Sequence, residues 1–155
     1  MNPSPAVDVL DGLLAAESRS LIRHLDSSTV FVSWASADDA EAVRAMVVED
    51  AQHAELLTRT ILELEGNPSP LGYDPVAAGM HYLELHTLLP QVVAGEESLV
   101  ERYEDAIGRV ADEPAAAEVV ARLLARHRAR AGRLRTLTIT RQPSPEPARA
   151  TQTPD

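Results

Sequence analysis

The 155-residue chain contains no cysteine and no lysine, and aromatic residues make up only 3% of it. A protein without cysteine has no disulfides, no iron–sulfur clusters and no zinc sites with thiolate ligands. No apolar run approaches the roughly 18 residues that a membrane-spanning helix needs, and the first residues lack the basic segment of a signal peptide. We therefore expect a single-domain cytoplasmic protein that does not associate with a membrane.

The charged residues are unevenly distributed. The net charge is −10, which argues against nucleic acid as a partner, and all fourteen basic residues are arginine. Seven of these arginines lie between Arg122 and Arg141, a stretch without an acidic residue. We interpret them as the outer face of a last helix, where cations suit the C-terminus and complement acidic neighbours, rather than as a polyanion site.

The apolar residues recur with helical spacing throughout, and strand-like alternation is absent from the sequence. Ser36-Ala-Asp-Asp39 is typical of a capping box that opens a helix, and Gly66 is a natural residue to end one. Pro90 predicts a break or kink in the third helix. We predict four long helices, over residues 6–35, 36–65, 75–111 and 114–138.

The lengths of the links between these helices predict how they are arranged. Short turns join the first two helices and the last two, whereas a long link joins the middle two. This pattern predicts an all-α, antiparallel four-helix bundle with one long crossover connection. The bundle would occupy residues 6–140, between a flexible N-terminus of residues 1–5 and a Pro-rich, disordered tail of residues 141–155.

Each predicted helix carries a metal-ligating type of side chain in the middle of its apolar stripe. Mid-helix positions fall at similar heights in such a bundle, so these side chains can converge, and each is costly to bury without a partner. Carboxylates and imidazoles together suit iron, manganese or zinc, whereas calcium and magnesium prefer oxygen alone. The five candidate metal ligands are Glu17, Asp50, His53, Glu96 and His127. On the third helix we predict an inner stripe of Leu89, Val93, Glu96, Val100, Tyr103 and Ile107.

The order of these five residues, with HAELLTRTILELEG beginning at His53, resembles the ferritin-like superfamily, nearest to its bacterioferritin and rubrerythrin branch. In the di-iron bundles of that superfamily, two helices each supply one Glu and the other two each supply a Glu-x-x-His pair. The resemblance assigns the lone-Glu roles to Glu17 and Glu96, and the first pair to Asp50 and His53. It implies one or two iron ions, with zinc or manganese as alternatives, and either iron handling or reduction of oxygen or peroxide.

The chain departs from the family pattern at several positions. Leu124, three residues before His127, stands where the family has a metal-bridging Glu, and Asp50 replaces a Glu. Ala51 stands where bacterioferritins place the haem-ligating Met, so haem is not implied. His24, where bacterioferritins commonly carry Tyr, is a candidate sixth ligand or a donor to Glu96.

Three carboxylates leave one positive charge uncompensated beside two divalent ions. An exogenous anion or another protein carboxylate would then be needed. Glu49 and Glu97 are the nearest candidates, but both lie off the inner stripe, and we interpret them as solvated residues.

Two hypotheses follow. The first is a divergent iron protein that acts as a ferroxidase-like or peroxidase-like oxidoreductase. The alternative is a redox-silent single-zinc or metal-free bundle that serves as a binding or structural module. The resemblance also implies a homodimer, in which Trp34 is either an interface residue or packed against the first turn. The Pro-rich tail replaces the short fifth helix of storage cages, so a 24-subunit shell is not expected.

Overall fold

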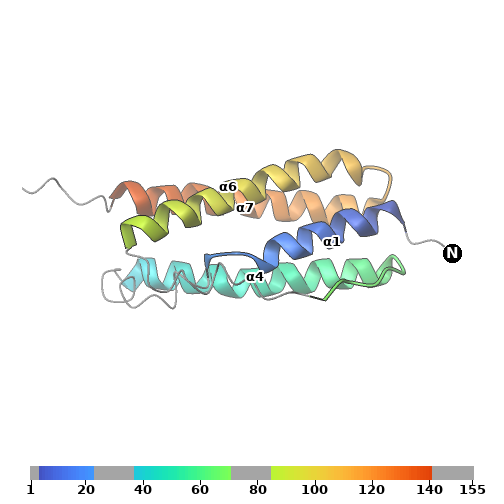
Figure 1. Ribbon diagram of the computed structural model, residues 1–155, viewed down its shortest axis with the longest axis horizontal. Coiled ribbons are helices and arrows are strands. Elements are labelled where there is room, and N and C mark those ends of the chain that lie inside the picture. Colours follow the sequence, from blue (N-terminus) through green and yellow to red (C-terminus); the bar gives the residue numbers. More distant parts are fainter. Residues whose placement is uncertain (1–3, 23–36, 71–84, 141–155) are drawn as a thin grey trace, which may run out of the picture.

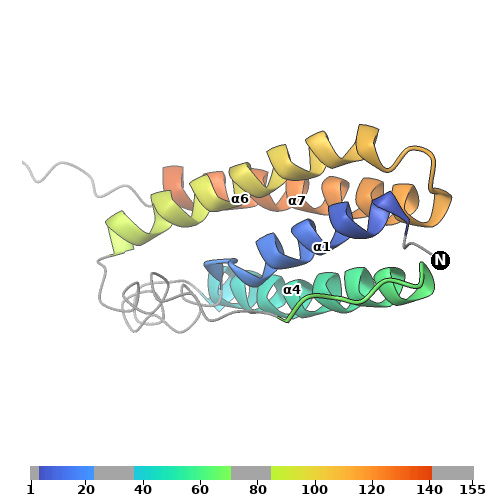
Figure 2. The same ribbon diagram turned by 45° about the vertical axis from the view of Figure 1, so that its right-hand side comes forward.

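The computed structural model describes residues 4–22, 37–70 and 85–140. These residues form four helices, α1 (Pro5–Ser18), α4 (Ala37–Glu63), α6 (Leu85–Arg109) and α7 (Pro114–Thr140), and no strand. α1 is antiparallel to α4, and α6 is antiparallel to α7 (Figures 1 and 2). α4 ends and α6 begins at opposite ends of the bundle (Figure 1), as a crossover connection between them requires. This confirms the predicted bundle with one crossover.

α1 is shorter than the helix predicted over residues 6–35. It starts after Ser4, whose Oγ accepts a hydrogen bond from the Ala6 N–H, and it ends at Ser18. The N–H groups of the next two residues bond to carbonyls three positions back, which tightens the last turn. Ser20 Oγ then accepts from the Ile22 N–H, and such local bonds compete with helix continuation. Residues 23–36, which include His24, Trp34 and Ser36, the first residue of the predicted capping box, lie outside the described residues.

The end of α4 corrects the prediction that Gly66 is the left-handed terminal residue. Glu65 has the positive φ of 62°, and its N–H bonds to the Leu62 carbonyl. The Gly66 N–H bonds to the Ile61 carbonyl, which completes a Schellman motif. Gly66 is needed for a different reason, because a Cβ there would lie 2.5 Å from Val7 Cγ1. The glycine lets the end of α4 pack against α1.

α6 differs from its prediction in two respects. The helix is not broken at Pro90, which lies near its start with its side chain exposed, so one early backbone hydrogen bond is lost while the rest of the helix packs. Leu89, Glu96 and Tyr103 are buried as predicted, but the alternate positions of the buried face shift by one residue. Ala106 is buried, for example, whereas the larger Ile107 is 41% exposed. The buried positions alternate steps of three and four along the helix: Leu89, Val92, Glu96, Leu99, Tyr103, Ala106 and Val110.

The core consists of two apolar clusters separated by a polar layer. One cluster includes Leu10, Leu57 and Leu123, and the other includes Met46 and Leu134. α1 contacts α4 and α6, and α7 contacts the same two helices, so each helix contributes to the enclosed layer. Burial of such side chains, at about 1.5–3 kcal/mol each, stabilises the bundle on both sides of the polar groups.

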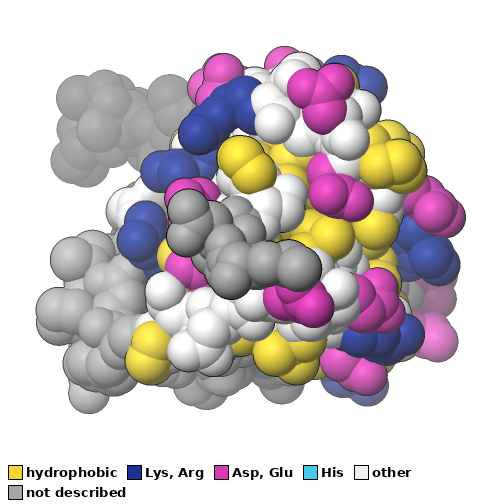
Figure 3. Space-filling model, turned by 90° about the vertical axis from the view of Figure 1, so that its right-hand side faces the viewer, with side chains coloured by type: hydrophobic (Ala, Val, Ile, Leu, Met, Phe, Trp, Pro, Cys, Tyr) yellow, Lys and Arg dark blue, Asp and Glu magenta, His cyan; other side chains and the backbone are white. Residues whose placement is uncertain are grey.

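The outside of the bundle is charged. In the view from the end where α1 begins, arginine and acidic side chains surround the apolar groups, and no histidine side chain is visible on this face (Figure 3). None of the described helices combines the length and the apolar character required to cross a membrane.

Candidate metal centre

The structure brings all five predicted ligands into the polar layer between the two apolar clusters. Each lies one or two turns from apolar residues of its own helix that belong to the core, so the packing of the helices fixes their heights. All five are buried, with exposed fractions between 0% and 8%. Glu17, Asp50, His53, Glu96 and His127 therefore lie together in one buried layer, and their role as metal ligands stays a prediction.

Three of these residues form a tight group. One potential ligand atom from each of Glu17, His53 and His127 lies within 4.8 Å of the other two. His127 Nε2 is 2.6 Å from Glu17 Oε1, and His53 Nδ1 is 3.7 Å from the same oxygen. The two imidazole rings meet edge to face, with centroids 4.8 Å apart. A carboxylate and two imidazoles at these separations can share one metal ion.

His127 is held between two carboxylates. Besides the contact to Glu17, its Nδ1 lies 2.5 Å from Glu96 Oε1. Burial alone would lower the pKa of His127, but hydrogen bonds to Glu17 and Glu96 raise it to about 9. For Glu17, burial alone would raise the pKa. Contacts with His127, His53 and Tyr103 outweigh the effect of burial and lower the pKa of Glu17 to about 2. Without metal, the His127 imidazolium therefore bridges Glu96 and the ionised Glu17 at neutral pH.

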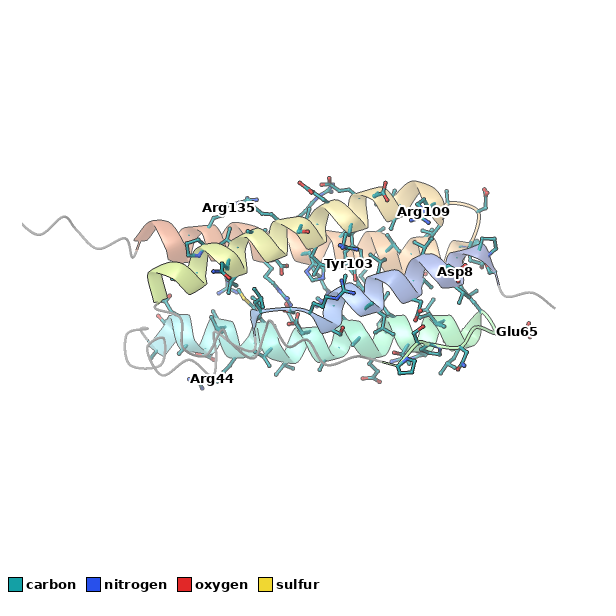
Figure 4. All side chains as sticks on the ribbon, viewed as in Figure 1. Asp8, Arg44, Glu65, Tyr103, Arg109 and Arg135 are labelled. Atoms are coloured by element: carbon teal, nitrogen blue, oxygen red, sulfur yellow. The ribbon has the colours of Figure 1, made fainter. Side chains whose placement is uncertain are left out.

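Tyr103 also orients Glu17. It points from α6 into the middle of the bundle, whereas Arg44, Arg109 and Arg135 point outward (Figure 4). Its hydroxyl donates a 2.6 Å hydrogen bond to Glu17 Oε1, and its ring lies against His127 with centroids 5.1 Å apart. Burial and the negative charge of Glu17 raise the pKa of Tyr103, so the phenol keeps its proton. The sequence analysis placed Tyr103 on the inner stripe but did not recognise this polar role.

Arg130 is the site residue that the sequence analysis missed. Its side chain is 3% exposed, and it donates hydrogen bonds to Asp50, Glu49 and the Met46 carbonyl. Burial lowers its pKa, but attraction to Asp50 and Glu96 outweighs this and raises the pKa further above its usual value. Its position in the sequence could have indicated this role. Arg130 lies three residues after His127 and four before Leu134, which places it at the edge of the inner stripe.

The two off-stripe carboxylates differ from one another. Glu49 is recruited toward the site, since its Oε2 accepts a 3.1 Å hydrogen bond from Arg130 Nη2. Glu97 instead forms a 2.7 Å ion pair with Arg135 on the surface, as expected of a solvated residue. The interpretation of Glu49 as purely solvated is therefore wrong, because a buried arginine lies within its reach.

Buried nitrogen and oxygen atoms that lack a hydrogen-bond partner show whether the site can accept a metal ion. Among the described residues, the buried donor atoms without a hydrogen-bond partner include Glu17 Oε2, Asp50 Oδ2 and both ring nitrogens of His53. Unpaired buried polar atoms are costly, and a cation in this group would satisfy one oxygen of Glu17 and one ring nitrogen of His53. The donor set therefore fits one ion between Glu17, His53 and His127. The same layer does not offer a complete set of ligands for a second ion, because Arg130 already binds Asp50.

Two solved structures are similar to this fold. The bacterioferritin of Desulfovibrio desulfuricans, which has a diiron site, matches with a TM-score of 0.73 and 15% identity, over 86% of this chain and 78% of that one. The bacterioferritin of Rhodobacter capsulatus, solved with a metal-free dinuclear site and haem iron, matches with a TM-score of 0.68 and 20% identity, over 87% and 84%. The protein has a ferritin-like fold.

No family model matches the sequence, and a search of curated proteins found no match. The likeness of this ferritin-like bundle to known proteins is therefore one of structure, at low sequence identity.

The ferritin-like fold clarifies the second ligand pair. In di-iron bundles this pair is Glu-x-x-His, and here His127-x-x-Arg130 has the same spacing. His127 contacts both lone Glu residues, Glu17 and Glu96, as a bridging side chain would. Leu124, which the sequence analysis aligned with the bridging Glu, belongs to an apolar cluster. His127 and Arg130 therefore both enter the polar layer from α7, three residues apart.

Proposed function

We propose that this ferritin-like protein binds a single transition-metal ion, iron in the first instance, between Glu17, His53 and His127. The observation that supports this most directly is the set of buried donor atoms without partners on Glu17 and His53. Two imidazoles and a carboxylate are a ligand set that iron and zinc both accept. The similar bacterioferritins hold iron or dinuclear sites in the same kind of bundle, which favours iron.

The surrounding residues would hold the ligands in place. Tyr103 fixes one oxygen of Glu17 by hydrogen bonding and leaves the other oxygen without a partner. Glu96 accepts from His127 Nδ1, which orients the imidazole and leaves Nε2 for the ion once the proton shared with Glu17 has gone. The apolar clusters pack on both sides of this layer. Bound iron would supply one-electron chemistry toward oxygen or peroxide, which places the protein in iron handling or oxidant reduction.

Metal quantification tests the proposal. Metal-free protein is titrated anaerobically with Fe(II), desalted and analysed for metal per chain. We expect one ion in the wild type, and at least a tenfold weaker affinity in Glu17→Gln and His53→Ala. Glu97→Gln is the matched control, because Glu97 is a surface carboxylate paired with Arg135. A wild type that binds no more iron than His53→Ala would remove the proposal.

A second candidate is a redox-silent zinc site. The ligand set of two His and one Glu favours it, since zinc sites use this combination. Competition between Zn(II) and Fe(II), followed by exposure to air, separates the two candidates. Oxidation of Fe(II) faster than in Glu17→Gln supports the oxidoreductase. Retention of zinc with no oxidation above that control supports the silent site.

A further inference from the structure

We propose that Arg130 is a built-in cation that takes the place of a second metal ion and limits this site to one ion per chain. The inference rests on the proposed function, and it concerns the other half of the polar layer. There the carboxylates of Asp50 and Glu96 face a guanidinium, where a di-metal site would hold an ion between carboxylates.

Arg130 engages the carboxylates that a second ion would need. Its Nη1 lies 2.5 Å from Asp50 Oδ1 and 3.8 Å from Glu96 Oε2. Its Nη2 lies 3.1 Å from Glu49 Oε2 and 3.2 Å from the Met46 carbonyl oxygen. Glu96 is therefore shared: one oxygen contacts His127, and the other faces Arg130. A second ion could take up these oxygens only by displacing a guanidinium that is itself 3% exposed.

Counting charges gives the same result independently. The buried carboxylates of the layer are Glu17, Asp50 and Glu96, and together they carry three negative charges. Glu49 is not counted, because its side chain is 37% exposed and solvent screens its charge. Arg130 supplies one positive charge, and a divalent ion that displaces the His127 proton supplies two. The layer is then neutral with one ion, whereas a second divalent ion would leave two positive charges in a medium that penalises them. Arginine keeps its proton at any accessible pH, so this cation is permanent.

The experiment replaces that cation. Arg130→His removes the permanent charge and gives the second pair an imidazole, whereas Arg130→Lys keeps the charge. Arg133→His is the matched control, because Arg133 is an exposed arginine on the same helix. Each metal-free variant is titrated anaerobically with Co(II), desalted and analysed for metal per chain, and its folding is checked by circular dichroism. Co(II) absorbance and magnetic coupling between neighbouring ions provide a second readout.

We expect one ion in the wild type, Arg130→Lys and Arg133→His, and two coupled ions in Arg130→His. A folded Arg130→His that binds the same number of ions as the wild type overturns the inference. If Arg130→His does not fold, the titration uses His127→Glu/Arg130→His, which restores Glu-x-x-His, and one ion or none in that variant overturns it. A third outcome separates the two proposals. If the wild-type protein binds no metal and the Arg130→His variant binds an ion, the proposed function is refuted and the role of Arg130 is supported.

Discussion

The stability of the metal-free protein should fall as the pH rises from 6.5 to 9, because His127 must then lose the proton that bridges Glu17 and Glu96. The pKa of His127 is about 9 in the folded protein, against 6.5 for the free side chain. Its contribution is therefore complete below pH 6.5 and is lost as the pH rises through 9. The difference corresponds to about 3 kcal/mol, at 1.4 kcal/mol for each tenfold change in proton affinity.

Glu17 sets the acid side of the same profile. Its pKa is about 2 in the folded protein, against 4.5 for the free side chain. The stability that it contributes is complete above pH 4.5 and is lost as the pH falls toward 2. Because the two residues share one hydrogen bond, their contributions overlap and should not be added. The metal-free protein should thus be most stable between about pH 4.5 and 6.5.

Urea unfolding of chelator-treated protein, followed by circular dichroism across pH 4 to 9.5, measures this profile. The composition makes the alkaline arm easy to interpret, since the chain has no cysteine and no lysine to titrate there. His127→Gln should be less stable overall, and it should lack the decline between pH 6.5 and 9. A wild-type stability that stays level or rises over that interval would refute the bridging imidazolium.

Three further predictions concern single positions. Tyr103→Phe should destabilise the metal-free protein by about 1.5–3 kcal/mol in urea unfolding, because a hydrogen bond to a buried charge is lost while the ring remains. An unchanged urea concentration at the unfolding midpoint would contradict this prediction. Leu124→Glu should lower the melting temperature without adding a metal ion, because residue 124 lies in the apolar cluster; a gain of metal per chain would instead restore the alignment made from sequence. Glu65→Gly should stabilise the protein by about 0.5–1 kcal/mol, because glycine relieves the positive φ of 62° at some entropic cost; a lower melting temperature would show that the Glu65 side chain makes a compensating contact.

The local features of the fold were largely predictable. Helical spacing of apolar residues identified the helices, and the apolar residues that recur at this spacing along α7 are buried, from Val120 to Leu137. The errors arose where two local signals competed. On α6 the larger Ile107 drew the predicted stripe away from Ala106, although packing selects regular spacing rather than the most hydrophobic residue. At the end of α4 the glycine was given the left-handed conformation that Glu65 adopts.

The sequence by itself determined that each helix would bring a buried ligand-type residue to the centre of the bundle, because periodicity sets which face of a helix is buried. Only the tertiary structure decided how those residues pair. His127 contacts Glu17 across 110 positions of the chain, and Arg130 contacts Asp50 across 80. Periodicity cannot assign such contacts, since a long arginine side chain at the edge of a stripe can reach either solvent or the core. The packing of α4 against α7 turned Arg130 inward, and so placed a fixed cation in a site that the sequence alone suggested was only short of a carboxylate.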